Sequence, residues 1–164
     1  MKIILIFLVS YNIFASQVFL IPDENNYFSY WIKKDLRTAK NIEIVSSEFS
    51  SQKIFRLVRK FANRDEVLAR IILDKNRQSI ISKLKIYKNI EIFQLSGLQN
   101  SEMNLNFIII DKKILYLLSN PLTKKGLNQN YGFIIRTKNT KMIEKFLNIF
   151  NITIKRSLTK LGTD

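Results

Sequence analysis

The chain has 164 residues, enough for one domain with a substantial core, and 46% of them are hydrophobic, which excludes a disordered chain. Its formal net charge of +14 favours polyanionic partners such as nucleic acid or acidic membrane surfaces, although a merely solvated basic protein would show the same excess. The absence of Cys and His excludes disulfides and thiolate chemistry and removes the commonest general base and metal ligand.

The first 15 residues have the pattern of a secretory signal peptide. Lys2 is followed by an apolar stretch of about a dozen residues, which ends at the small residues Ala15 and Ser16. The stretch is too short for a comfortable membrane span, but a weak cleavage site also allows an uncleaved anchor. We therefore expect residues 1–15 to be a signal peptide or an anchor, and the protein to be exported to the periplasm or envelope of a bacterium.

Strand and helix patterns alternate along the rest of the chain. Short apolar runs predict strands at 17–21, 41–45, 67–73, 89–95, 107–110, 114–118 and 131–137. Apolar residues at helical spacing predict helices at 27–40, after a cap at Ser50 or Ser51, at 77–87 and after a cap at Thr140. This order predicts an α/β domain over residues 16–156, with a mixed sheet flanked by helices on both faces, and a frayed tail at 157–164.

Basic side chains follow the outer face of the helix after Ser51. Its apolar face consists of Ile54, Leu57, Val58 and Phe61. A basic stripe opposite such a face is commonly only the solvated side of the helix, and its functional interpretation is a surface that binds phosphates. With two lysines of a later turn, the predicted nucleic-acid-binding residues are Lys53, Arg56, Arg59, Lys60, Arg64, Lys112 and Lys113.

The stretch from 103 to 132 carries the most specific pattern. Two apolar runs, 107–110 and 114–118, flank the polar break Asp111-Lys112-Lys113, which predicts a hairpin. Asn120-Pro121 predicts the start of a short helix, and Gly126 predicts its end. Asn130-Tyr131 then precedes the last predicted strand.

This stretch resembles the active-site hairpin of the phospholipase D superfamily, in particular of its small, secreted, single-motif bacterial nucleases. Their motif reads H-x-K-x4-D, then G-S-x-N after a strand, then N-Y-E at the start of another strand. The catalytic histidine and lysine positions fall on Asn104 and Asn106. The positions that match the motif are Asp111, Ser119, Asn130 and Tyr131, whereas Leu118, Pro121 and Gly132 replace its glycine, asparagine and glutamate.

The resemblance implies phosphodiester hydrolysis through a covalent phosphohistidine, with the aspartate orienting the histidine and with two subunits sharing the site. A carboxamide at Asn104 is neither a nucleophile nor an acid near neutral pH. Asn106 lacks the positive charge that would hold a phosphate. We therefore predict no catalytic residue, and a degenerate motif at Asn104, Asn106, Asp111, Ser119 and Asn130. Asp111 as a turn residue, Ser119 as a polar strand end and Asn130 as a loop cap are the structural alternatives.

Together these features predict an exported, catalytically degenerate phospholipase-D-like domain that binds nucleic acid as a homodimer, or as a heterodimer with a paralogue. One alternative is a non-catalytic interaction subunit that pairs with an active paralogue or an envelope assembly. Others are a peripheral binder of acidic phospholipid headgroups and a residual phosphodiesterase. The acids are scattered and no Gly-rich phosphate loop is present, so we expect neither a metal nor a cofactor. The sequence after residue 16 shows no evident membrane-inserting apolar patch.

Overall fold

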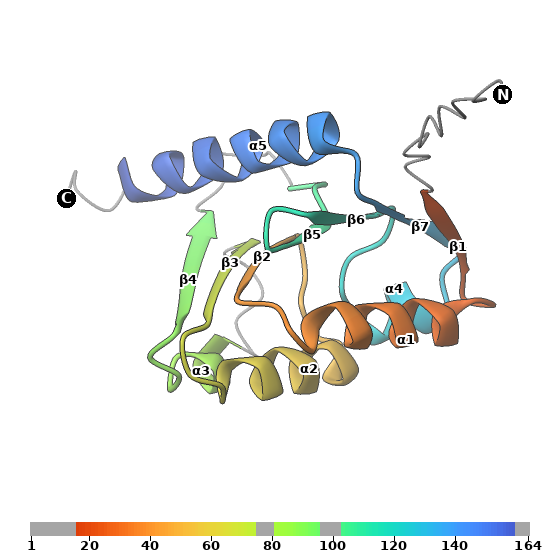
Figure 1. Cartoon of the computed structure of the whole chain (residues 1–164), viewed down its shortest axis with the longest axis horizontal. Helices are drawn as coiled ribbons and strands as arrows, with labels where there is room; N and C mark the ends of the chain where they lie inside the picture. Colours follow the sequence, from red (N-terminus) through yellow and green to blue (C-terminus); the bar gives the residue numbers. More distant parts are fainter. Residues whose placement is uncertain (1–15, 75–80, 96–102, 160–164) are drawn as a thin grey trace, which may run out of the picture.

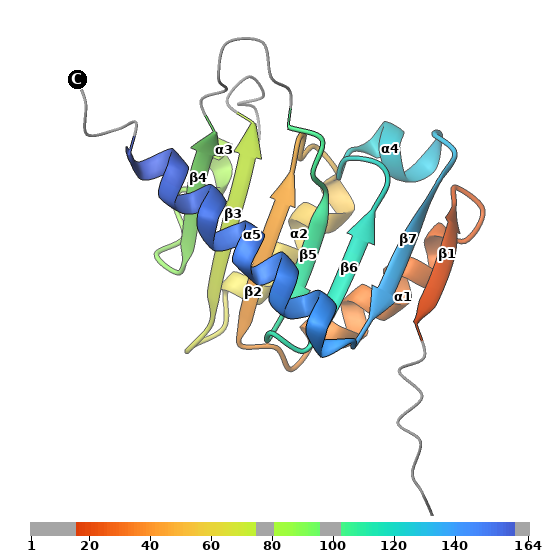
Figure 2. The same cartoon turned by 90° about the horizontal axis from the view of Figure 1, so that it is seen from above.

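A seven-stranded mixed sheet forms the centre of the computed structural model, which describes residues 16–74, 81–95 and 103–159 (Figures 1 and 2). The signal-peptide prediction for residues 1–15 lies outside this description. The strands are β1 (Gln17–Ile21), β2 (Asn41–Ser46), β3 (Leu68–Asp74), β4 (Ile90–Leu95), β5 (Phe107–Ile110), β6 (Ile114–Leu118) and β7 (Gly132–Thr137). Their order in the sheet is β1-β7-β6-β5-β2-β3-β4, in which β2, β3 and β4 are parallel and the other pairings antiparallel.

Helices cover both faces of the sheet, so the predicted α/β architecture is confirmed. The helices are α1 (Asn25–Leu36), α2 (Gln52–Ala62), α3 (Ile81–Leu84), α4 (Lys124–Asn128) and α5 (Thr140–Thr159). Figure 1 shows α1, α2 and α3 on one face and α5 on the other. None of the helices in the described ranges combines the length and hydrophobicity needed to cross a membrane.

The core has two layers because the central strands are buried on both sides. Ile42 and Ile44 of β2 pack toward α1 and α2, whereas Val45 packs with α5. The four residues of β5 are all buried, which explains why its sequence is a continuous apolar run without alternation. The helices bury one stripe each: α1, for example, buries Phe28 and Ile32, one turn apart.

A polar network fastens α1 to the sheet inside this core. Arg136 of β7 donates to the two carboxylate oxygens of Asp35 at 2.8 and 2.9 Å, and the Tyr116 hydroxyl of β6 donates to the same carboxylate. Burial raises the pKa of Tyr116 well above its ordinary value of 10.0, and the bond to Asp35 adds to that effect. The Arg136 guanidinium also lies 4.7 Å from the centre of the Trp31 ring.

Several predicted boundaries are wrong. The first helix was expected to reach residue 40 but ends at Leu36. The last helix continues to Thr159 with Ser157 buried, so it passes the expected start of the tail at residue 157. Residues 77–80 of the helix predicted at 77–87 lie outside the described residues, and the described part is helical from Ile81 to Leu84 and not to residue 87.

The short helix after β6 starts later than the Asn120-Pro121 pair predicted. Thr123 is its N-cap, and the Thr123 hydroxyl accepts the N–H of Gly126 at 2.8 Å. Gly126 therefore lies inside α4 and does not end it. A Cβ atom at this position would lie 2.4 Å from the carbonyl oxygen of Pro121, so the glycine serves close packing of the loop.

Candidate functional site

Most of the motif positions converge on one edge of the sheet, the upper edge in Figure 2. Strands β2 and β6 end at this edge and β5 and β7 begin there, because the β2–β5, β5–β6 and β6–β7 pairings are antiparallel. Asn106 directly precedes β5, Ser119 directly follows β6, and Gly132 is the first residue of β7. Asn104 lies two residues before Asn106 and is exposed.

The Asn106 side chain is held by the end of β2. Its Oδ1 atom accepts the backbone N–H of Ser47 at 3.1 Å and lies 3.0 Å from the Ser46 hydroxyl oxygen. The Ser46 hydroxyl in turn accepts the backbone N–H of Leu122 at 3.0 Å. Asn106 therefore acts as an acceptor that joins β2 to β5, a role that a lysine ammonium, which only donates, could not fill.

Asp111 lies at the opposite end of β5. Asp111 follows Asn106 by five positions along the extended strand, which corresponds to about 17 Å. Its Oδ1 atom accepts the backbone N–H groups of Lys40 and Asn41 at 2.8 and 2.7 Å. Asp111 and Lys112 have φ angles of 50° and 53°, as a tight two-residue hairpin turn requires. Asp111 is thus a turn residue, and it cannot orient a side chain at Asn104 or Asn106 as the resemblance implied.

Ser119 and Asn120 fill the space beside Gly132. The Ser119 hydroxyl accepts the N–H of Phe133 at 2.8 Å, and the Asn120 amide lies 3.0 Å from the carbonyl oxygen of Gly126. A Cβ atom on Gly132 would lie 2.3 Å from Ser119 Oγ and 2.5 Å from Asn120 Nδ2. A side chain at this position would therefore displace the side chains of Ser119 and Asn120, so a glutamate does not fit beside them as they stand.

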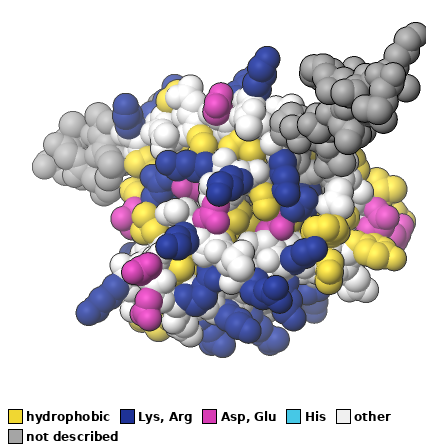
Figure 3. Space-filling model, viewed as in Figure 1, with side chains coloured by type: hydrophobic (Ala, Val, Ile, Leu, Met, Phe, Trp, Pro, Cys, Tyr) yellow, Lys and Arg dark blue, Asp and Glu magenta, His cyan; other side chains and the backbone are white. Residues whose placement is uncertain are grey.

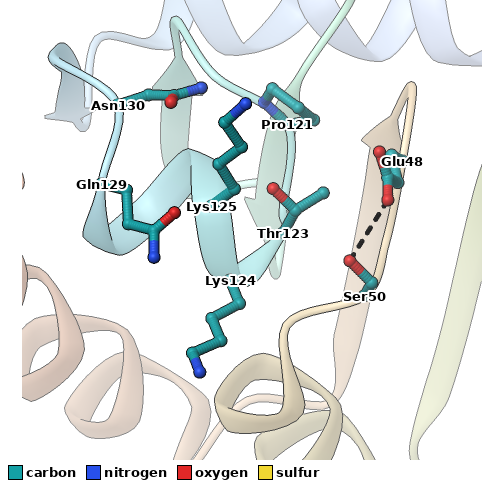
Figure 4. Close-up of a pocket in the computed structure, with 8 residues that line it drawn as sticks. All are labelled: Glu48, Ser50, Pro121, Thr123, Lys124, Lys125, Gln129 and Asn130. Atoms are coloured by element: carbon teal, nitrogen blue, oxygen red, sulfur yellow. Dashed lines mark hydrogen bonds between the residues drawn. The ribbon is translucent and has the colours of Figure 1, made fainter.

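A hollow of about 500 Å³ lies between the end of β2 and the α4 loop (Figure 4). Lys125 and Asn130 extend over it from the α4 side, and Glu48 and Ser50 face them. The Ser50 hydroxyl donates to the Glu48 carboxylate at 3.3 Å. Of the five motif positions, only Asn130 lines this hollow.

Two further hollows continue from Lys124 along α1 and α2, and we call these two together the basic groove. The larger one has a volume of about 640 Å³ and is lined by Lys33, Lys53, Arg56, Lys124, Ser29, Ser50, Ser51, Gln52, Leu57 and Asn128. The smaller one has a volume of about 130 Å³ and is lined by Lys33, Leu36, Arg37, Leu57, Lys60, Phe61 and Arg64. No carboxylate is among these described lining residues. Figure 3 shows Lys and Arg side chains gathered on the lower side of the molecule, where α1 and α2 lie.

The predicted nucleic-acid-binding residues are only partly brought together. Lys53, Arg56 and Lys60 line the basic groove, and Arg59 is exposed on α2 outside it. Arg64 also lines the groove, but its guanidinium donates to the backbone carbonyl of Ala39 at 2.6 Å and so has a structural role. The remaining two, Lys112 and Lys113, lie in the hairpin turn, at the edge of the sheet opposite the motif positions.

Sequence reasoning missed three basic residues of the groove. Lys33 and Arg37 come from the end of α1, and Lys124 comes from the start of α4. Nothing in the sequence links these elements, although two lysines in the last turn of α1 were a visible signal. Within the described ranges, no group of three or more acidic side chains is placed to hold a metal ion.

Comparison with known proteins identifies the fold. The model of the family described as "Cardiolipin synthase, PLD-like domain" matches residues 32–154. This chain is a small, single-motif member of the phospholipase D superfamily. It is similar to NucT from Helicobacter pylori, with 26% identity, a TM-score of 0.78, and coverage of 87% of this chain and 97% of that one. No curated protein sequence matches the chain at a significant level.

Two further solved structures share the phospholipase-D-like fold. Nuc from Salmonella typhimurium, described as a phospholipase D family member, is 19% identical to this chain with a TM-score of 0.72. The match covers 87% of this chain and 95% of the Nuc chain. TrmBL2, an archaeal chromatin protein whose structure is described as showing a novel mode of DNA binding, is 20% identical with a TM-score of 0.56. That match covers 90% of this chain and 54% of TrmBL2.

Proposed function

We propose that this phospholipase-D-like domain is a non-hydrolytic binding protein that holds nucleic acid through the phosphates of its backbone. The basic groove carries the proposal. It presents four cationic side chains, Lys33, Lys53, Arg56 and Lys124, in one hollow whose described lining has no carboxylate. Such a surface attracts nucleic acid whatever its base sequence, because each phosphate that it neutralises releases condensed counterions.

Two features support the absence of hydrolysis. The positions of the family's histidine and lysine are Asn104 and Asn106, and the sequence has no histidine that could replace the nucleophile. The Oδ1 atom of Asn106 is engaged with Ser46 and Ser47, so this oxygen is not presented to a substrate. We infer that the ancestral site now has a structural role, while phosphate binding takes place in the neighbouring groove.

We also propose that the protein is exported and forms a homodimer. An exported protein would meet nucleic acid outside the cytoplasm, which suits the signal-like pattern of residues 1–15 and the absence of Cys. The homodimer that the resemblance implies, with the hairpins of the two subunits facing each other, would place two grooves on one assembly.

Fluorescence anisotropy of a labelled single-stranded oligonucleotide, measured with the full chain across a salt series, tests the proposal. We expect log affinity to fall linearly with log salt, with a slope of roughly −2 to −4, as neutralisation of about three to six phosphates would give. Charge reversal of Lys53, Arg56 and Lys60 to Glu should weaken binding strongly and flatten this slope, since these side chains line the groove.

The matched control reverses three charges on the other face of the sheet. Lys138, Lys141 and Lys145 are exposed at or near the start of α5, and their replacement by Glu changes the net charge by the same amount. This variant should retain most of the affinity. Equal losses in the two variants would show that binding follows net charge alone and would overturn the assignment to the groove.

A further inference from the structure

Hydrophobic side chains are exposed at one end of the molecule. Nine large hydrophobic residues are exposed in the described part of the chain, and four of them lie on or directly before β1 and β7, with exposed fractions of 46% to 88%. We call these four the β1-end patch: Val18, Leu20, Tyr131 and Phe133. Figure 3 shows hydrophobic side chains gathered at this end, beside the start of α1. The sequence alone did not reveal this group of exposed side chains.

The pleat of the edge strand places these four side chains on one surface. In β1, Phe19 and Ile21 are buried in the core, so the alternate residues Val18 and Leu20 point outward. Leu20 is the register partner of Phe133 in β7, and Tyr131 lies two residues before Phe133. Helix α5 runs diagonally from the end of β7 toward β4 and leaves β1 uncovered (Figure 2).

Tyr27 and Tyr30 are exposed on the outer surface of α1 and do not belong to this patch. Phe28 and Ile32 of α1 share the core with Phe19 of β1, so α1 covers the face of the sheet opposite to Val18 and Leu20. Tyr30 lies one turn from Lys33, which lines the basic groove. The patch therefore lies on the α5 side of the sheet and the groove on the α1 side, so one can be covered while the other stays open (Figure 1).

The position of the patch along the chain indicates what covers it. Residues 3–15 form the longest apolar stretch of the sequence, and Gln17, the first residue of β1, follows with only Ser16 between. We propose that the β1-end patch docks the domain on a lipid bilayer, the one that receives the apolar N-terminal stretch. With so short a connection, a bilayer holding residues 3–15 must lie within a few residues' reach of β1.

The chemistry of the patch fits the interface of a bilayer and not its charged headgroups. Tyr131, with 88% of its side chain exposed, has an apolar ring whose hydroxyl stays hydrated, as at the boundary between acyl chains and water. The turn between β1 and α1 carries Asp23 and Glu24, so no cationic excess accompanies the apolar side chains. Docking should therefore not require anionic lipid, in contrast to binding of acidic headgroups by the basic surface.

Fluorophore labelling of the full chain tests this orientation, because the protein has no Cys and a single introduced thiol is labelled uniquely. The variants are Leu20→Cys within the patch and Ile86→Cys as the control, which is exposed but lies far from β1. Each carries an environment-sensitive fluorophore and is incorporated into neutral phosphatidylcholine–phosphatidylethanolamine vesicles containing nitroxide-labelled lipid. Nitroxides about 5–10 Å below the headgroups, the depth typical of interfacial apolar faces, should quench the label at 20 several-fold more than the label at 86.

Three results would overturn the proposal. Equal quenching at the two sites would show that the patch does not face lipid. Quenching of the label at position 20 that appears only with anionic vesicles would show that electrostatic attraction to acidic headgroups, and not the apolar patch, brings this site to the bilayer. A label at 20 that is shielded in detergent solution and unquenched in vesicles would show that a second protein chain covers the patch. If Leu20→Cys fails to fold, Val18→Cys, on the same face of β1 and 56% exposed, gives the same comparison.

Discussion

The hydroxyl oxygen of Ser46 lies 3.0 Å from Oδ1 of Asn106, at the position that the phospholipase D motif gives to lysine. The same hydroxyl accepts the N–H of Leu122, and Asn106 also accepts the N–H of Ser47. Two short side chains thus connect the end of β2, the start of β5 and the α4 loop. A position that binds a phosphate oxygen in the family's reaction holds the protein's own backbone in this chain.

Replacement of Asn106 by Leu should destabilise the fold. The Ser47 N–H would lose its acceptor in a partly buried place, which typically costs about 1–3 kcal/mol of the free energy of unfolding. Urea titration followed by circular dichroism measures this change. Asn104→Ala, at an exposed position two residues away, is the matched control and should change the free energy of unfolding by less than about 0.5 kcal/mol. Similar losses in both variants would contradict a structural role for Asn106.

Gly132→Ala should destabilise the loop that follows β6. Its Cβ would lie 2.3 Å from Ser119 Oγ and displace that hydroxyl from the Phe133 N–H, at a cost of about 1–3 kcal/mol. The double variant Gly132→Ala/Ser119→Gly removes one of the clashing atoms and should recover part of the loss. Thermal unfolding of the four proteins gives the coupling between the two sites, and strictly additive effects would contradict the contact.

The stabilising contribution of Tyr116 should vanish at high pH. Burial raises the pKa of Tyr116 in the folded protein, so the folded state keeps this proton more tightly than the unfolded state does. The contribution is therefore complete below pH 10.0, the ordinary pKa, and is lost as the pH rises above it. Urea titrations of the wild type and Tyr116→Phe from pH 7 to 11 should show a difference in unfolding free energy that shifts steadily in favour of the variant above about pH 10. A difference independent of pH would contradict the raised pKa.

Introducing the histidine and lysine of the family motif should not produce hydrolysis. In Asn104→His/Asn106→Lys the nucleophile and the cation return, but Gly132 still stands at the glutamate position and Asn120 fills the space beside it. We expect no turnover of bis(p-nitrophenyl) phosphate above the rate of the wild type. The introduced lysine should also lower stability, because it cannot accept the Ser47 N–H. Measurable turnover by the folded variant would show that the loop does not obstruct the site.

The fold was predictable because its signals are local. Apolar runs such as 107–110 and 114–118 marked buried strands, and the Asp111-Lys112-Lys113 break marked the turn between them. The start of α4 was misplaced, because two capping candidates, Asn120 and Thr123, lie three residues apart. The side chain of Asn120 instead binds the backbone of its own loop.

The candidate site was less predictable because it depends on contacts between distant segments. Lys33 and Lys124 meet in one groove although about ninety residues separate them, and neither stood out in the sequence. The β1-end patch was hidden for another reason. The sequence of β1 is apolar from Val18 to Ile21 without alternation, and only the structure shows that α5 leaves Val18 and Leu20 uncovered.

The central claim is that this phospholipase-D-like protein binds phosphodiesters without cleaving them. One sample tests both halves: a 5′-labelled single-stranded oligonucleotide is incubated with excess full-length chain at low salt, its anisotropy is recorded, and the strand is then resolved on a denaturing gel. We predict a saturating rise in anisotropy, reversed by salt, and an intact strand after prolonged incubation. Shortened products that increase with protein concentration in each of several independently purified wild-type preparations would contradict this prediction. The absence of binding at low salt would also contradict it.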